Sequence, residues 1–117
     1  MAKGANILTI LTNDGWWGNT PGHKQHLEYA RLRAIENRKW VARSANTGIS
    51  AVIDDKGNIL ETRGWNQAAS IKFSIPTTDT LTFYTRFGDW LYKGFSFLAL
   101  LILGWNILLV LKKKQLV

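Results

Sequence analysis

Apolar and polar positions in the first part of the chain follow two different repeats. Residues 7–11 form a short apolar run with β-branched side chains, and turn-forming residues follow at 12–15, which predicts a buried strand that leads into a loop. A helix is expected from residue 21 to about residue 39, with Thr20 as its cap and Pro21 as its first residue. Apolar side chains recur at helical spacing on one face of that segment: Leu27, Ala30, Ala34 and Ile35.

The next part of the chain has the pattern of short strands. Residues 40–45 predict one strand, and residues 49–53 and 59–63 predict a hairpin. The connection at 54–58 is rich in turn formers, and its Gly57 suits a left-handed backbone position. The predicted sheet therefore combines a strand–helix–strand unit with a hairpin.

Two further segments precede the C-terminal region. Residues 69–75 alternate between apolar and polar side chains, which predicts another strand. Residues 80–89 are polar and aromatic, and we expect an extended segment at a membrane interface there.

The C-terminal region has the length and composition of a membrane span. Residues 94–111 carry no charged side chain, and at about 1.5 Å per residue they would extend roughly 27 Å, close to the thickness of a hydrocarbon core. Trp90 and Tyr92 suit one interface, and Lys112 to Lys114 close the other end. We therefore divide the chain into a globular part, 1–89, and a transmembrane helix with a basic tail, 90–117.

Charge supports this division. The net charge is +7, of which residues 1–90 contribute +3, from 11 Lys and Arg against 8 Asp and Glu; the four lysines beyond residue 90 contribute the rest. Because basic residues are retained on the cytoplasmic side of a span, the C-terminus is expected in the cytoplasm and residues 1–90 outside it. The same distribution argues against a nucleic-acid partner.

The chain has no cysteine, which excludes disulfides, thiolate catalysis and thiolate metal sites. None of its serines or threonines stands in a nucleophile-elbow pattern. His23 and His26 share a predicted helix face, but Glu28 lies off that face, so ordinary surface or capping histidines are expected rather than a metal site. No cofactor is expected.

Three blocks of residues carry more specific information, and they follow one another in a fixed order. They are Asn13-Asp14-Gly15-Trp16-Trp17-Gly18, then His26 with the run from Tyr29 to Asn37, and then the run from Arg43 to Ile53. This order, followed by one apolar tail, resembles the C-terminal end of the apolipoprotein N-acyltransferases, a membrane-embedded family of the nitrilase (carbon-nitrogen hydrolase) superfamily. The resemblance covers nearly the whole chain; it is specific for 13–53 and rests on order alone for 64–90.

The resemblance implies an α+β fold: part of a nitrilase-like αββα sandwich, followed by one transmembrane helix. It implies a bacterial inner-membrane enzyme with residues 1–90 in the periplasm. Such an enzyme moves an acyl chain from a phospholipid to the amine of a lipoprotein's N-terminal cysteine through a thioester. The family's Glu-Lys-Cys triad would lie upstream of Met1, so no catalytic residue is expected in this chain, and the chain alone is expected to be inactive.

The resemblance also implies roles for individual residues. The loop after the first strand would lie beside the active-site pocket, and the pocket-lining candidates are Asn13, Asp14, Trp16, Trp17 and Gly18. Glycines let this backbone turn tightly, the indoles offer apolar surface to an acyl chain, and Asn13 and Asp14 can accept bonds from backbone amides.

Other residues of the three blocks are expected to support the fold. Glu36 would pair with Arg33 or Arg43 and brace the neighbouring strand, and Asn46 with Gly48 would shape the rim of the pocket. The structural-support candidates are His26, Arg33, Glu36, Arg43 and Asn46.

Several alternatives stay open at this point. A Met inside what would be a mid-domain loop favours a fragment or a shortened gene product over a truncated paralogue, and the missing N-terminal part of the enzyme is then a candidate partner. The chain also suits a single-span interaction module whose outer domain docks on another protein. A piece of a soluble nitrilase-like amidase is the third alternative, which the apolar tail disfavours.

Overall fold

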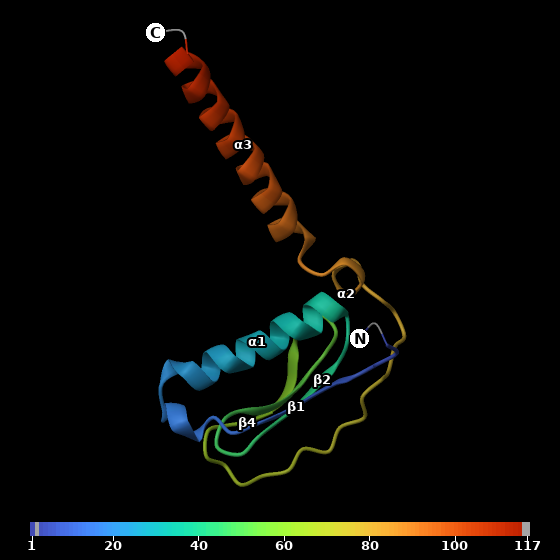
Figure 1. Cartoon of the computed structure of the whole chain (residues 1–117). Coiled ribbons are helices and arrows are strands. Elements are labelled where there is room, and N and C mark those ends of the chain that lie inside the picture. The colour runs from blue at the N-terminus through green and yellow to red at the C-terminus, as the bar shows by residue number, and fades with distance from the viewer. Residues whose placement is uncertain (2, 116–117) are drawn as a thin grey trace. The chain divides into compact units, whose positions relative to one another are not determined.

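The computed structural model describes residues 1 and 3–115, and it divides the chain into two compact units. Met1–Arg86 form the first unit, and the second begins at Phe87. The first unit contains a four-stranded sheet in the order β1-β2-β3-β4, with the helix α1 packed on one face (Figure 1).

A strand–helix–strand unit opens the fold. Strand β1, Leu8–Thr12, pairs in parallel with β2, Val41–Ala45, and the helix α1, Pro21–Asn37, connects them. Parallel neighbours require a crossover of this kind, because the chain must return to the end at which it started. The predicted cap is confirmed: Thr20 accepts a hydrogen bond from the Gly22 amide, and Pro21 is the first helical residue.

The predicted hairpin completes the sheet. Strand β3, Ser50–Ile53, pairs antiparallel with β2 and with β4, Ile59–Arg63. Gly57 in the turn has a φ of +85°, as its position predicted, and its carbonyl accepts a hydrogen bond of 2.8 Å from Nε of Arg31 on α1. The turn is thereby fastened to the helix that covers the sheet.

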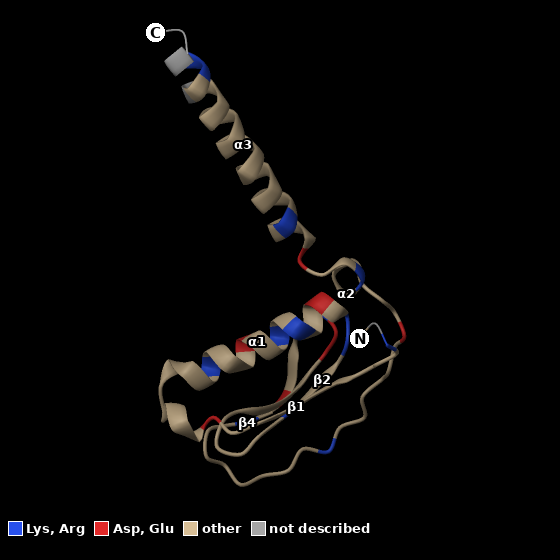
Figure 2. Ribbon diagram, in the orientation of Figure 1, with Lys and Arg blue, Asp and Glu red and all other residues tan. Residues whose placement is uncertain are grey.

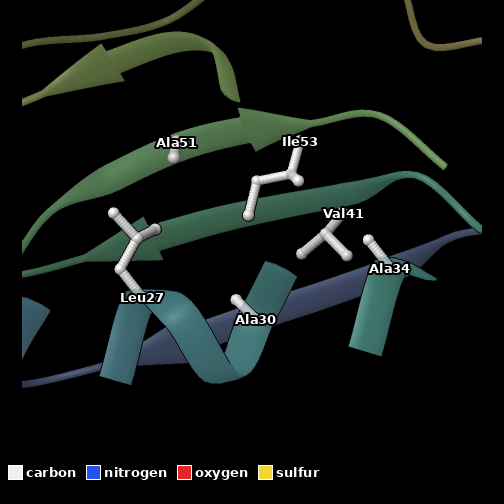
Figure 3. Packing of buried hydrophobic residues seen from close by; sticks show 6 residues of the cluster. All are labelled: Leu27, Ala30, Ala34, Val41, Ala51 and Ile53. Atoms are coloured by element: carbon white, nitrogen blue, oxygen red, sulfur yellow. The ribbon is translucent and has the colours of Figure 1, made fainter. Parts of the chain in front are cut away.

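Small side chains let α1 approach the sheet closely. The core cluster comprises Leu27, Ala30 and Ala34 from the helix and Val41, Ala51 and Ile53 from the strands (Figure 3). The fourth apolar residue of the predicted helix face, Ile35, is 40% exposed and belongs to the rim of that face. Burial of this cluster is the main apolar contribution to the first unit, at roughly 25 cal/mol per Å² removed from water.

One predicted strand is wrong. Residues 69–75 have no strand structure, although their side chains alternate as a strand's do. This segment runs along the face of the sheet opposite α1 (Figure 1), where residues 69–71 help to line a cavity and Phe73 contacts the Trp40 ring, with centroids 5.9 Å apart. It contacts the sheet with side chains, and a strand instead needs a neighbour that shares backbone hydrogen bonds.

The segment at 80–89 also differs from the prediction. A short helix, α2, occupies Phe83–Phe87 within what was expected to be an extended segment. Thr82 precedes it and accepts a hydrogen bond of 3.0 Å from the Thr85 amide, which is the usual bond of a helix cap.

The second unit contains the helix α3, Trp90–Gln115. Residues Trp90–Lys113 of this helix are long and apolar enough to cross a membrane, and none of the side chains that the structure describes among them is buried. Lys and Arg lie toward the ends of α3 and are absent from its middle (Figure 2). The α+β class and the apolar C-terminal helix are therefore confirmed, and one sheet with one helix layer corresponds to part of an αββα sandwich.

Candidate functional site

The loop that follows β1 has a defined structure. Asn13 Oδ1 accepts a hydrogen bond of 3.1 Å from the Gly15 amide, and a single 3-10 turn, η1, covers Gly15–Trp17. Gly18 then adopts a φ of +59°, which a residue with a Cβ rarely takes, and its amide donates to the Gly15 carbonyl at 3.1 Å. The loop leaves the carboxyl end of a parallel strand, where α/β folds commonly place binding sites.

Beneath this loop lies a buried ion pair. The Asp14 carboxylate accepts a hydrogen bond of 2.7 Å from Nη2 of Arg43, and neither side chain is exposed. Nδ1 of His26 lies 2.9 Å from the other carboxylate oxygen. In the tautomer that carries its proton on Nδ1, His26 donates to this carboxylate, which only accepts hydrogen bonds; the same Nδ1 lies 3.2 Å from Nη2 of Arg43. Asp14 thus joins the loop to β2 through Arg43 and to α1 through His26.

These contacts set the ionisation of Asp14. Burial raises the pKa of this carboxyl, but hydrogen bonds from His26 and Thr12 and the positive charge of Arg43 more than offset burial, so the pKa of Asp14 lies below its ordinary value of 3.8. Asp14 is therefore a permanent anion at neutral pH. It was expected to bond backbone amides, and its observed partners are instead three side chains.

The two indoles of the loop stack on each other, and one of them contacts His26. Trp16 and Trp17 stack with ring centroids 5.4 Å apart, and Trp16 is 82% exposed. Trp17 is half-buried and meets the His26 ring edge-on at 5.1 Å. The inner indole is thus held by the ion-pair cluster, and it presents the outer indole to the surroundings.

The run from Arg43 to Ile53, which covers the end of β2, the turn after it and β3, encloses the same carboxylate. Gly48 is buried directly against Asp14, so closely that a Cβ at this position would clash with the carboxylate. The Asn46 amide donates to the Thr12 carbonyl at 2.9 Å, and Nε of Arg43 donates to the Ile49 carbonyl at 3.1 Å. The block therefore forms part of the enclosure of Asp14.

Glu36 has the first of its two predicted partners. Its carboxylate accepts a hydrogen bond of 2.6 Å from Nη1 of Arg33, one helical turn earlier on α1. Arg43 belongs instead to Asp14. The Glu36 pair lies on a partly exposed part of the helix, away from the buried cluster, and a pair of this kind contributes about 0.5 kcal/mol at most.

Two residues are more buried than their sequence suggests. His23, expected as a surface or capping residue, is 2% exposed and packs against Trp65 with ring centroids 4.5 Å apart. Lys39 is 1% exposed, and its ammonium donates to the Thr78 carbonyl. No local pattern marks these two positions, because their partners are distant in sequence. Among residues 1 and 3–115, no three His, Cys, Asp or Glu side chains lie together as a metal site would require.

A cavity of about 370 Å³ lies on the face of the sheet opposite α1. It is lined by small side chains of β1, β2 and β3, such as Thr9, Ala42 and Ser50, and by residues 69–71. None of the five pocket-lining candidates contributes to it. Arg43, which pairs with Asp14, also lines the cavity, so this residue is shared by the cavity and the support of the aromatic loop.

These features define a class of protein: an α+β domain in which a buried Asp–Arg pair supports an aromatic loop at the carboxyl end of a parallel strand. The model of the carbon-nitrogen hydrolase family matches residues 1–80, and the chain belongs to that family.

Curated relatives narrow the similarity further. A protein of Azotobacter vinelandii, named apolipoprotein N-acyltransferase, is 36% identical over 108 residues, which are 92% of this chain and 20% of the relative. Proteins of the same name from Rhizobium meliloti and Bradyrhizobium diazoefficiens are 41% identical over 111 residues and 49% identical over 82. Those alignments cover 91% and 70% of this chain but 21% and 15% of the relatives. The chain thus spans about a fifth of the length of the relatives it matches.

Proposed function

We propose that this chain acts as part of an apolipoprotein N-acyltransferase, to which it supplies one sheet with its helix layer, a pocket loop and a membrane-spanning helix. The reaction would transfer an acyl chain from a phospholipid to the N-terminal amine of a lipoprotein's cysteine. The observation that carries the proposal is the buried Asp14–Arg43 pair, which fixes the aromatic loop of a carbon-nitrogen hydrolase domain. The identities of 36% and 49% to relatives of that name, over 92% and 70% of this chain, support it.

The chemistry divides between this chain and the rest of such an enzyme. A thioester needs a cysteine sulfur, and this chain has none, so the nucleophile and its base would come from another segment. The chain alone would therefore transfer no acyl group. Its own contribution is positioning, because holding reactants in one geometry supplies a large part of enzymatic rate enhancement.

The loop residues have distinct tasks in this proposal. Trp16, which is exposed and rigidly stacked, would offer its indole face to the acyl chain. Trp17, His26 and Asp14 would keep that face in place from below. A buried ion pair suits this task, since loss of either partner leaves an uncompensated buried charge beside the loop.

The face of the sheet opposite α1 is where we propose that the remaining part of the domain packs. Leu11 on β1 is 80% exposed, and Thr9 and Ser44 of neighbouring strands are exposed as well. The sheet has a helix layer on one face only, and an αββα sandwich needs a second sheet on the other face. The same surface suits the second candidate, a membrane-attached module that docks on a different protein.

We propose that α3 crosses the bacterial inner membrane, with residues 1–90 in the periplasm and the C-terminus in the cytoplasm. The apolar length of Trp90–Lys113 supports a span, and the basic residues near its C-terminal end support this orientation.

A split-enzyme assay tests the proposal. The Bradyrhizobium diazoefficiens relative, with the segment that matches this chain deleted, is co-expressed with this chain and purified into vesicles with acyl-labelled phospholipid and a diacylated lipopeptide. Labelled triacylated lipopeptide is expected only from the pair, with the intact relative as positive control and each half alone as blank.

Two outcomes would overturn parts of the proposal. Transfer by this chain alone would show that it holds a nucleophile of its own. A deleted relative that neither co-purifies with this chain nor gains activity from it, in vesicles where the intact relative works, would favour the module that docks on a different protein.

A further inference from the structure

The segment between the sheet and α3 is fastened to the end of α1. The Thr82 hydroxyl donates to the Glu36 carbonyl at 2.6 Å, and the Thr85 hydroxyl donates to Oδ1 of Asn37 at 3.0 Å. Glu36 and Asn37 are the last two residues of α1, where helix carbonyls have no partner within the helix. Thr82 therefore supplies a partner for one carbonyl at the end of this helix, and Thr85 bonds the side chain of its last residue.

Further bonds hold the same segment. Nη1 of Arg33 donates to the Tyr84 hydroxyl at 3.3 Å, and the buried Lys39 ammonium donates to the Thr78 carbonyl. We call the four connector residues that make these bonds the clasp: Thr78, Thr82, Tyr84 and Thr85. The clasp lies within the first unit and fixes the start of α2 against α1.

The two sides of α2 differ in character. Tyr84 and Thr85, which contact α1, are half-buried. Phe83 and Phe87 are one helical turn apart, and they are 57% and 56% exposed. A helix of five residues thus has one polar side bonded to the protein and one side with two large exposed aromatic rings. Scattered single apolar residues are ordinary, but a pair on one turn indicates a surface that meets an apolar partner.

The short connection between α2 and α3 indicates what this apolar partner is. Only Gly88 and Asp89 separate α2 from α3, and the step from Phe87 to Trp90 reaches at most about 11 Å. If Trp90 begins a membrane span, Phe87 lies at most about 11 Å from the edge of the hydrocarbon core, a distance comparable with the headgroup region of roughly 5–8 Å on each side. Aromatic rings and cationic side chains are enriched at this depth, and Arg86 supplies the cation on α2.

We propose that α2 is an interfacial helix whose Phe83 and Phe87 insert into the lipid surface, while the clasp joins it to α1. This inference rests on the proposed membrane span of α3. It assigns two contacts with the bilayer to this chain, the span and the aromatic side of α2. The end of α1 would then be held at the membrane surface by hydrogen bonds rather than by a free tether.

The absence of cysteine from the sequence makes a direct test simple, since one introduced cysteine takes one label. The variants Phe83→Cys, Leu101→Cys and Gln25→Cys of the full chain each carry an environment-sensitive fluorophore. Leu101 lies within the proposed span, and Gln25 is exposed on α1. The vesicles contain phosphatidylethanolamine and phosphatidylglycerol, with a nitroxide quencher placed either near the headgroup or deep in the acyl chains. Circular dichroism confirms that each variant keeps its fold.

The expected pattern separates the two proposals. The label at position 83 should lose most of its fluorescence to the shallow quencher, the label at 101 to the deep quencher, and the label at 25 to neither. Quenching at 101 without quenching at 83 would overturn the interfacial helix and leave the span intact. A label at 101 that neither quencher reaches would overturn the span itself. Phe87→Cys provides a second position on the same side of α2 and should behave as position 83 does.

Discussion

The Asp14 carboxylate lies 2.7 Å from Nη2 of Arg43, and both side chains are fully buried. This one contact joins the loop after β1 to the neighbouring strand, and His26 ties the same carboxylate to α1. Two charges are rarely buried unless they are paired and hydrogen-bonded. The pair is therefore the point at which the fold and the candidate site depend on each other.

Replacement of Asp14 measures that dependence. The variant Asp14→Asn leaves the Arg43 guanidinium buried without its counter-charge, and we expect the free energy of unfolding to fall by about 3–5 kcal/mol. Chemical unfolding of the full chain in detergent measures the loss. Asn13→Ala is the matched control: it removes two exposed hydrogen bonds, from the Gly15 amide and the Thr47 hydroxyl, and should cost about 1 kcal/mol. Equal losses for the two variants would contradict a special role for the pair.

Acid sensitivity follows from the same carboxylate. The pKa of Asp14 is lowered in the folded chain, so its contribution to stability is complete above its ordinary value of 3.8 and is lost as pH falls through the folded-state pKa. We expect the thermal midpoint to drop below about pH 4, and to drop less steeply in Asp14→Asn. An identical pH profile for the variant would contradict this assignment.

Asp54 contributes in the same pH range and provides the comparison. Burial raises the pKa of Asp54, but hydrogen bonds from the Asn58 side chain and from the backbone amides of Asn58 and Lys56 more than offset burial. The pKa of Asp54 therefore lies below its ordinary value. Asp54→Asn should therefore remove a separate part of the acid dependence, measured as the change in thermal midpoint with pH. Because Asp54 is in the hairpin turn, its effect should add to that of Asp14.

Gly48 tests how closely the enclosure of Asp14 is packed. A methyl group at this position would clash with the carboxylate, so Gly48→Ala should destabilise the first unit by roughly 1–3 kcal/mol, as overpacking does. Gly64→Ala is the control, since a Cβ there meets only the flexible Gln67 side chain at ordinary contact distance. Thermal unfolding of both variants gives the comparison, and a neutral Gly48→Ala would show that the loop shifts freely.

The two tryptophans should separate stability from activity. Trp16 is 82% exposed, so Trp16→Ala should leave the unfolding free energy within about 0.5 kcal/mol of the parent. Trp17 packs against His26 and beside Gly22, so Trp17→Ala should lower it measurably. In a chimaera in which this chain replaces the matching segment of the Bradyrhizobium diazoefficiens relative, Trp16→Ala should still reduce acyl transfer. Full activity of that variant would argue against an acyl-binding role for Trp16.

Local signals predicted the fold where a single element decides the structure. Thr20 with Pro21 marked the start of α1, and Gly57 marked the hairpin turn, because both depend on nearby backbone geometry. The strand predicted at residues 69–75 was wrong. Alternating apolar and polar side chains indicate that a segment has two different faces, but they do not show whether a neighbouring strand is there to share backbone hydrogen bonds. The five residues of α2 are too few for a helical period to show, and the cap at Thr82 was not recognised.

The sequence predicted which residues belong to the candidate site but not which side chains pair with one another. The resemblance selected Asp14 and Arg43 and gave them separate roles, whereas the structure pairs them across 29 positions of sequence. The sheet register decides whether Arg43 forms its ion pair with Glu36 or with Asp14, because it sets which side chains come together. No local spacing encodes that register. The clasp was not predicted for the same reason, because its residues bond to partners that are distant in sequence.

The rate of acyl transfer by the chimaera tests the central proposal most directly. The purified chimaera, which keeps the rest of the relative, is incubated with acyl-labelled phospholipid and a diacylated lipopeptide, and the triacylated product is measured by mass. The account predicts transfer at a rate comparable to that of the intact relative, and loss of transfer in the chimaera with Asp14→Asn. A folded, membrane-inserted chimaera that transfers no acyl chain would contradict the account.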